Sequence, residues 1–410
     1  MAHTRTRYIQ VILQKALKHK GIVGLFGHRQ VGKTTVLECM ATNYATLDRA
    51  VDLASATEAP ENFLTTHLKM GTPLAIDECQ LAAPLFPALK EHVRQDKRPG
   101  IFLLSGSVRF TSRKAIRESL TGRMLHHELL PFSISELDGE PINTLALELL
   151  SCRGFSGLKL KPPSRTLAKH THAMHYLKQG GLPGLCFVRN ERDRNDLIES
   201  QIDLIINRDL RLVCETSLPL SSLKNIIRHL ATLQNTPLNL SDLARKTRIS
   251  LPTLRKIITG LEAIFFIRMI ACEGNESRPV MFFEDQGEAS YLSSIRRAGE
   301  AGTATSSVAD LERLAFAHLR IPFSYTPGLN WTLTQYRQQG GAYVPFVFRV
   351  QDKSLGFLCM EESLPSLGAS RSAASFLTKN KQAKVVYLHP GKEIVVLNDR
   401  ELVLPLVMVL

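Results

Sequence analysis

The chain contains a short glycine-rich segment whose spacing is typical of phosphate binding. Residues 27–34 read Gly-His-Arg-Gln-Val-Gly-Lys-Thr and match the pattern G-x-x-x-x-G-K-[ST] at every fixed position. In this pattern the glycines let the backbone turn its N–H groups toward a phosphate. The lysine reaches the β- and γ-phosphates, and the hydroxyl binds Mg²⁺. We therefore expect the nucleotide-binding residues to be Gly27, His28, Arg29, Gln30, Val31, Gly32, Lys33, Thr34 and Thr35.

Two adjacent acids end a second apolar segment. Residues 73–78 read Pro-Leu-Ala-Ile-Asp-Glu, which indicates a buried strand that ends in Asp77 and Glu78. An aspartate at such a strand end can hold Mg²⁺ together with Thr34, and the glutamate beside it can polarise the attacking water as a general base. The alternative is an acidic turn after a core strand, but the position downstream of the phosphate pattern favours hydrolysis.

Two further groups are candidates for contact with the γ-phosphate. The strand expected over 100–107 ends in hydroxyls, and Ser107 or Ser105 at its tip could hydrogen-bond the attacking water. Arg123 follows a basic segment and could stabilise the charge of the γ-phosphate, in cis or from a neighbouring subunit. The serines could equally serve a turn, where serine is frequent, and the arginine could simply be exposed at a helix end.

The segments around these residues alternate between apolar strands and helices. The phosphate pattern lies between a strand over 22–26 and a helix over 35–41, which is the context that it requires. This alternation predicts an α/β fold with a parallel sheet covered by helices on both faces. The other expected elements are helices over 8–18, 57–70 and 84–95 and strands over 45–48, 73–78, 100–107 and 125–130.

Composition gives weaker information about partners. The chain has 410 residues, 44% of them hydrophobic and 22% charged, which is ordinary for a globular protein and long enough for several domains. The net charge of +13 divides into +7 for residues 1–135, +5 for 136–275 and +1 for 276–410. Such a basic excess favours nucleic acid or an anionic surface, but it also occurs in proteins that bind neither.

The spacing of the cysteines and histidines, together with the lack of long apolar runs, argues against several kinds of metal, disulfide and membrane protein. The seven cysteines are scattered and form no C-x-x-C, so we expect neither a disulfide framework nor a zinc ribbon, and a reducing compartment. Neither a signal core nor an apolar run of about 18 residues occurs, so we expect a cytoplasmic chain without a membrane span. The spacing of His170, His172 and His175 is poor for a metal site.

Residues 216–275 have the pattern of a winged helix. Helices are expected over 223–233, 239–247 and 251–262, with a tight turn over 248–250 and an apolar strand over 263–270. This order is typical of a winged helix-turn-helix, which binds DNA or serves as a protein-binding or lid module. If DNA is the partner, its phosphates would contact Arg245, Lys246, Arg248, Arg255 and Lys256.

The order of the motifs resembles the prokaryotic AAA-type ATPases that continue into a winged helix and a restriction-endonuclease-like C-terminal domain of unknown function. After the phosphate loop the matching segments are PLAIDECQ, LLSGS, SLTGR, LLPFSISEL, GGLPG, INRDLR, LNLSDLARKTRISLPTLRKIITGLE and FFEDQGEASYL. The resemblance implies ATP binding with Mg²⁺ and slow hydrolysis. It also implies a nucleotide domain over 1–137, a linker and helical lid over 138–215, the winged helix over 216–275, and the C-terminal domain over 276–410.

The C-terminal domain departs from this family where the relatives carry nuclease acids. Pro345 stands at the expected aspartate, and Cys359 and Glu361 stand where a glutamate and a lysine are expected. A Mg²⁺-dependent nuclease site needs carboxylates as hard oxygen ligands. We therefore expect a degenerate domain without nuclease activity.

The sequence leaves three functions, in decreasing order of support. The first is a Mg²⁺-dependent ATPase that acts as a molecular switch for a DNA or protein partner. The second is a DNA-binding regulator that senses ATP without significant turnover, and the third is a nuclease. An oligomer is required only if Arg123 acts in trans.

Overall fold

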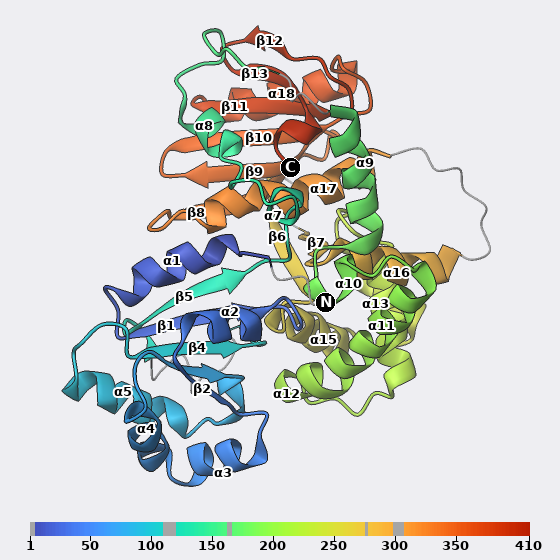
Figure 1. Cartoon of the computed structure of the whole chain (residues 1–410). Coiled ribbons are helices and arrows are strands. Elements are labelled where there is room, and N and C mark those ends of the chain that lie inside the picture. Colours follow the sequence, from blue (N-terminus) through green and yellow to red (C-terminus); the bar gives the residue numbers. More distant parts are fainter. Residues whose placement is uncertain (1–4, 110–119, 162–165, 275–277, 298–306) are drawn as a thin grey trace.

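The computed structural model describes residues 5–109, 120–161, 166–274, 278–297 and 307–410 (Figure 1). Its first unit is a sheet in which the strands run in the order β2-β3-β4-β1-β5, and every neighbouring pair is parallel. The strands are β1 (Ile22–Gly27), β2 (Asn43–Thr46), β3 (Leu74–Asp77), β4 (Phe102–Gly106) and β5 (Met124–Leu129). The helices are α1 (Tyr8–Leu17), α2 (Lys33–Met40), α3 (Ala50–Glu58), α4 (Pro60–Leu68) and α5 (Leu85–Gln95).

Helices cover both faces of this sheet because its strands are apolar on both sides. Val23 and Leu25 share one core with α1 and α2, whereas Ile22 shares another with α4 and α5. This division follows from the alternation of side chains along a strand. The predicted α/β fold with a parallel, doubly covered sheet is therefore confirmed.

The helix expected over 57–70 is interrupted in the structure. Helices α3 and α4 meet at Ala59, whose φ of −138° and ψ of 64° are not helical. Pro60 follows directly, and a proline disfavours the helical conformation of the residue before it. The segments on both sides are helical, as their periodicity predicts, but Pro60 separates them into two helices.

The helices after β5 divide between two cores. They are α7 (Ile134–Leu137), α8 (Leu145–Ser151), α9 (Thr166–Gln179), α10 (Pro183–Cys186), α11 (Glu191–Leu204), the π-helix η3 (Ile205–Leu210) and α12 (Arg211–Val213). Residues of α8 and α9 pack with the C-terminal sheet, whereas those of α10, α11 and η3 pack beside α1 and α2. The segment 138–215 is therefore shared between the two cores, and its first half also contacts the nucleotide domain, where the Tyr8 hydroxyl donates to the carbonyl of Glu140.

The helices of the predicted winged helix are followed by a two-stranded hairpin. The elements are α13 (Leu220–Ala231), α14 (Leu240–Thr247), α15 (Leu251–Ala263), β6 (Ile267–Gly274) and β7 (Val280–Phe283). The first half of β6 pairs with β7, and its second half, from Ala271 to Gly274, pairs in parallel with β8 (Trp331–Arg337). The hairpin thus belongs to the C-terminal sheet, and the boundary expected at residue 275 crosses that sheet.

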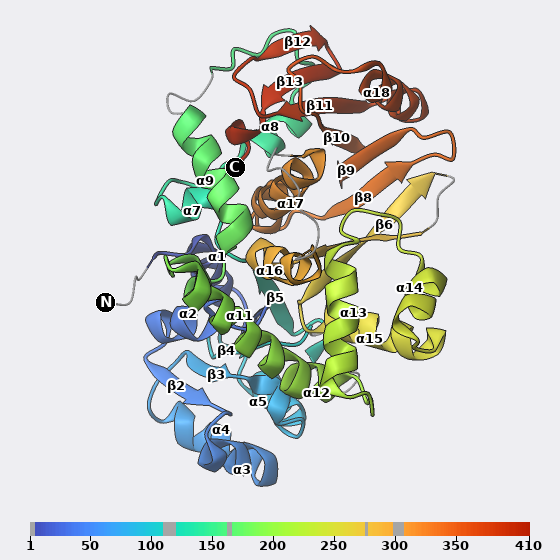
Figure 2. The same ribbon diagram turned by 90° about the vertical axis from the view of Figure 1, so that its right-hand side faces the viewer.

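The C-terminal unit is a mixed sheet with helices on both sides (Figure 2). Its strand order is β12-β13-β11-β10-β9-β8-β6-β7. The remaining elements are α16 (Gln286–Arg297), α17 (Val308–Ser324), β9 (Tyr343–Val350), β10 (Lys353–Cys359), α18 (Leu367–Lys379), β11 (Ala383–His389), β12 (Val395–Asn398) and β13 (Glu401–Pro405). Helix α16 lies where the nucleotide domain, the helical region and the C-terminal unit meet (Figure 2).

Candidate functional site

The phosphate loop connects β1 to α2 and has the backbone that its glycines permit. Gly32 has a φ of +99°, in the left-handed region that favours glycine. A Cβ atom on Gly27 would lie only 2.5 Å from the carbonyl oxygen of Leu129 in the neighbouring strand. Both glycines are therefore required, one for conformation and one for space.

Lys33 begins α2 and points back into the loop. It is buried, and its ammonium donates to the carbonyl oxygens of Gly27 (3.1 Å) and His28 (2.9 Å). Burial lowers the pKa of Lys33, while the nearby charges of Glu78 and Asp77 oppose this shift. The ammonium thus lies inside the loop, beside two acids of the neighbouring strand end.

Three hydroxyls gather on the carboxylate of Asp77 at the end of β3. The Thr34 hydroxyl donates to Asp77 Oδ2 over 2.5 Å, and the Tyr44 hydroxyl donates to the same oxygen over 3.0 Å. Ser105, in β4, donates to the other carboxylate oxygen. Thr34 and Asp77 offer two hard oxygen atoms side by side, which fits the ligand preference of Mg²⁺.

Glu78 follows Asp77 in a left-handed conformation, with a φ of +54°. This is uncommon for a residue other than glycine. It turns the Glu78 carboxylate toward Gln80, which donates to it, and toward the hydroxyl of Ser107 at 3.4 Å. The side chains of Glu78, Gln80 and Ser107 thus form one polar group beside the phosphate loop.

Arg123 lies at the amino-terminal ends of the strands of the nucleotide sheet, whereas the phosphate loop lies at their carboxyl ends. It precedes β5, whose first residue, Met124, pairs with Ile22 at the start of β1. The phosphate loop follows the far end of β1, about 17 Å away at the usual rise per strand residue. A role of Arg123 in cis is therefore wrong on geometry, and a role in trans stays a prediction.

The other predicted loop residues differ in surroundings. Val31 is buried, and its carbonyl accepts from Arg7, which also donates to the carbonyl of Leu130. Gln30 and Thr35 are exposed. Arg7, a residue that the motif did not indicate, thus fixes the backbone of the loop to the end of β5.

Two loop side chains are paired with acids far away in the sequence. Arg29 forms an ion pair of 3.1 Å with Asp209 in η3, and the His28 ring lies 3.2 Å from Glu288 in α16. Arg208, the residue before Asp209, is paired with Asp48, which lies just after β2. This hydrogen bond and then the charges of Asp48, Glu78 and Asp209 raise the pKa of Arg208 above its usual value, so its guanidinium lies within electrostatic reach of Glu78.

Sequence reasoning missed these pairs because their partners are distant in the chain. The available signals were the segments INRDLR and FFEDQGEASYL, which carry Asp209 and Glu288 but do not indicate their partners. The structure adds that this segment is a π-helix. Such helices are rare and are frequently found at functional sites.

The basic residues of the winged-helix region are exposed on α14, α15 and the turn between them. Arg245 and Lys246 both pair with Asp242, so part of their charge is neutralised within α14. Arg248 is exposed in the turn. Arg255 and Lys256 line a cleft of about 640 Å³ between α15 and the end of α12.

A second cleft of about 540 Å³ lies in the C-terminal unit, at the strand ends where nuclease acids were considered. Pro345 in β9 and Cys359 in β10 line it, together with Glu312 of α17 and Tyr343. Asn235 and Tyr343 donate to the Glu312 carboxylate, and burial raises the pKa of Glu312 to about 7. The strand pair is thus present without the aspartate that a nuclease site requires.

The described residues contain no group of three or more His, Cys, Asp or Glu side chains that could hold a metal ion. The structure does bring Asp138 to 3.5 Å from His172, a neighbour that the sequence had not indicated. Within the described part of the chain, no helix is both long and apolar enough to cross a membrane.

A comparison with protein-family models matches the region of the nucleotide domain. A family model described as an AAA domain matches residues 19–138, and one for a domain of unknown function, DUF8612, matches residues 171–297. Uncharacterized proteins of Mycobacterium tuberculosis and Mycobacterium bovis are each 24% identical over 403 residues, which cover 96% of this chain and 82% of theirs.

Likeness to solved structures is weak. The Aeropyrum pernix ORC1 protein in complex with DNA gives a TM-score of 0.31 at 12% identity, and the match covers 73% of this chain and 95% of that one. AMPPCP-bound DnaA from Aquifex aeolicus gives a TM-score of 0.25 at 13% identity, with coverage of 61% and 86%. The strand order, the phosphate loop and the family match together identify residues 19–138 as an AAA-type domain of the phosphate-loop ATPase class.

Proposed function

We propose that this protein binds ATP with Mg²⁺, hydrolyses it slowly, and acts as a nucleotide-dependent molecular switch. The observation that carries the proposal is the meeting of Thr34 and Asp77, 2.5 Å apart, beside the buried ammonium of Lys33. Mg²⁺, when bound, would neutralise phosphate charge, and Thr34 and Asp77 would hold it.

The phosphate loop supplies most of the binding. Its backbone N–H groups and the start of α2 attract the phosphates. The Lys33 ammonium would exchange the carbonyl oxygens of Gly27 and His28 for phosphate oxygens, which are charged and therefore stronger acceptors. Lys33 is thus the residue whose loss should affect binding most.

Glu78 is the proposed general base. Its carboxylate, beside Gln80 and Ser107, could accept a proton from the attacking water while the amide and the hydroxyl orient that water. The buried Lys33 ammonium lies near Glu78, whose charge opposes the lowering of the Lys33 pKa by burial, so the two groups belong to one site. Ser107 and Gln80 are therefore proposed to position rather than to react.

Arg208 is the proposed charge stabiliser in cis. Its guanidinium is paired with Asp48, and the charge of Glu78 also contributes to its raised pKa. Release from Asp48 would allow it to reach the γ-phosphate, where an arginine stabilises the charge of the transition state. Arg29 and Asp209 would hold η3, and thus Arg208, beside the loop.

DNA is the favoured partner of the switch, and a protein is the alternative. Arg248, Arg255 and Lys256 are exposed on the winged-helix region, and none of them has an ion pair with another described residue. The hairpin β6–β7 is part of the C-terminal sheet, so α15 and the preceding turn are the proposed DNA-contacting surface. A regulator that senses ATP without turnover would use the same surface.

The test is ATP hydrolysis with and without duplex DNA, on the wild type and on Lys33→Ala and Glu78→Gln. We expect Mg²⁺-dependent turnover that Lys33→Ala loses together with ATP binding, and that Glu78→Gln loses while it still binds ATP. A wild type that neither binds nor hydrolyses ATP refutes the proposal. ATP-dependent DNA binding with a steep salt slope and no turnover would support the regulator instead.

A further inference from the structure

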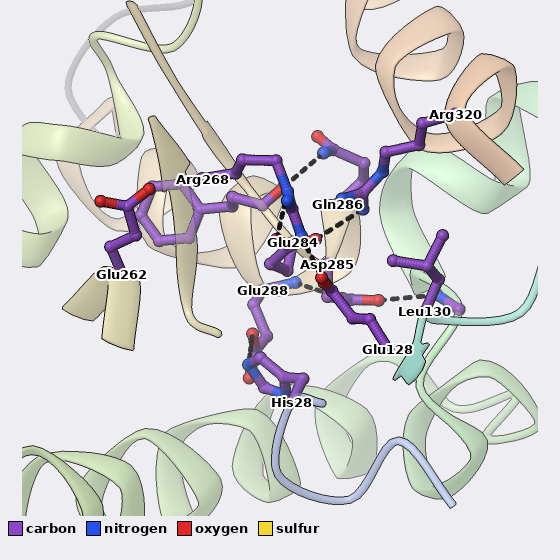
Figure 3. A network of polar contacts seen from close by, with 12 residues as sticks. His28, Glu128, Leu130, Glu262, Arg268, Glu284, Asp285, Gln286, Glu288 and Arg320 are labelled. Carbon is purple, nitrogen blue, oxygen red and sulfur yellow. Dashed lines mark hydrogen bonds and ion pairs between the residues drawn. The ribbon is translucent and has the colours of Figure 1, made fainter. Parts of the chain in front are cut away.

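The phosphate loop is held from outside its own domain by a buried ion pair. His28 Nε2 lies 3.2 Å from Glu288 Oε2, and the two side chains are 1% and 0% exposed (Figure 3). The imidazole also stacks on Phe266, just before β6, with ring centroids 5.8 Å apart. A side chain at a variable position of the phosphate motif is therefore anchored to α16, in the second half of the chain.

The surroundings of His28 favour its protonated imidazole. Burial is the largest single influence on the pKa of His28 and would lower it, but the charge and contact of Glu288, the backbone of Arg29 and the charge of Asp285 together raise that pKa above its usual value. Gln201 of α11 donates to the other Glu288 oxygen over 2.9 Å. Neither His28 Nε2 nor Glu288 Oε2 is aligned for a hydrogen bond, so the attraction between them is that of two charges in contact.

The backbone of His28 connects this pair to the phosphate-binding lysine. The His28 carbonyl oxygen accepts from the Lys33 ammonium over 2.9 Å, while the His28 side chain faces Glu288. A displacement of α16 that moves the imidazole would therefore also move a carbonyl that Lys33 contacts.

Helix α16 also supports the loop by a second route. Asp285 caps its start and accepts from the backbone N–H of Gly181 over 2.7 Å. Two residues later, Pro183 begins α10 and lies against Gly32, with its Cγ 3.5 Å from where a Cβ of Gly32 would be. Asp285 and Glu288, three residues apart in the FFEDQGE segment, thus support two points of the same loop, Asp285 through residues 181–183 and Glu288 by direct contact with His28.

The same segment is fixed to the C-terminal unit. The buried Glu284 carboxylate pairs with Arg320 of α17 over 2.6 Å and with Arg268 of β6 over 2.8 Å. Arg313, also in α17, donates to the backbone carbonyl of Gln286 over 2.9 Å. These contacts connect α17 and β6 to the segment that begins the helix carrying Glu288 (Figure 3).

We propose that Glu288 is a positioning residue of the nucleotide site, which holds the phosphate loop through His28 and couples ATP binding to the C-terminal unit. This inference rests on the proposed ATP binding. A buried ion pair is weak evidence for stability, because apolar residues of similar volume often stabilise a fold as well. Its position between the loop and α16 favours a coupling role.

The variants are Glu288→Gln, His28→Gln and the double substitution, with Glu362→Gln as a control that removes an exposed acid outside this network. ATP affinity is measured by calorimetry with Mg²⁺, and KM and kcat by phosphate release. We expect each single substitution to raise Kd and KM for ATP about tenfold, within the usual range of coupling between sites, with little change in kcat. The double variant should be no worse than either single one, since both break the same pair.

The coupling itself has a separate readout, because a merely structural pair would not respond to nucleotide. In the wild type, ATP should slow hydrogen exchange of the backbone amides in residues 286–294. In His28→Gln this effect of ATP should be lost, even at saturating ATP. His28→Gln changes only a loop side chain, so it carries the test if Glu288→Gln fails to fold.

Two results are decisive against the inference. Folded Glu288→Gln or His28→Gln with wild-type Kd, KM and nucleotide-dependent exchange would overturn the coupling and leave ATPase activity standing. A wild type without ATP binding would overturn the proposed function and this inference together.

Discussion

Glu312 should make the stability of the protein depend on pH in a predictable way. Its carboxyl is buried against Asn235, from the loop after α13, and Tyr343 of β9. Burial is the largest cause of its raised pKa, which is about 7 instead of 4.5. Glu312→Gln keeps an acceptor for Asn235 and removes the charge, so it tests what that charge costs.

The magnitude follows from the two pKa values. The folded protein binds the proton of Glu312 more tightly than the unfolded chain, so stability is highest with the carboxyl protonated. This contribution is fully present below pH 4.5 and is lost as the pH rises through 7. The difference corresponds to about 3 kcal/mol, since a tenfold change in an equilibrium is worth about 1.4 kcal/mol.

We therefore expect Glu312→Gln to match the wild type at pH 4.5 and to exceed its unfolding free energy by up to about 3 kcal/mol at pH 8. Urea unfolding at several pH values between these limits measures the difference. Glu361→Gln, an exposed acid on the rim of the same cleft, should give a difference that does not vary with pH. A difference for Glu312→Gln that is independent of pH, or a loss of stability at pH 8, refutes the reasoning.

Three further predictions concern the nucleotide site and the buried network. Glu78→Gln should lower the single-turnover hydrolysis rate by about 100-fold or more with an unchanged Kd for ATP, and a changed Kd alone would contradict its role as base. Arg208→Ala should lower kcat by about 1000-fold, whereas Arg123→Ala should leave the turnover of a monomer unchanged; equal losses would favour action in trans. Glu284→Gln leaves buried arginines without their acid and should cost about 3–5 kcal/mol in urea unfolding, so a loss under 1 kcal/mol would count against the network.

The geometry of the candidate nucleotide site was largely predictable because its signals are local. Gly32 and Lys33 are fixed by a spacing that only a strand, a tight loop and a helix satisfy, and Asp77 ends an apolar strand. Parallel strands bring their carboxyl ends to one edge of a sheet, so such residues converge without further information. The pairing of β5 with β1 places Arg123 at the opposite, amino-terminal ends of the strands, and this pairing could not be read from the sequence.

The sequence by itself determined the α/β class of the nucleotide domain and the residues of its phosphate loop, since periodicity and fixed spacing express them directly. It could not show that Arg29 meets Asp209, 180 residues later, or that His28 meets Glu288. It also could not show that β6 joins the C-terminal sheet. Only the tertiary structure decided these contacts, because pairing between distant charges and between strand edges depends on how the units pack and leaves no periodic signal along the chain.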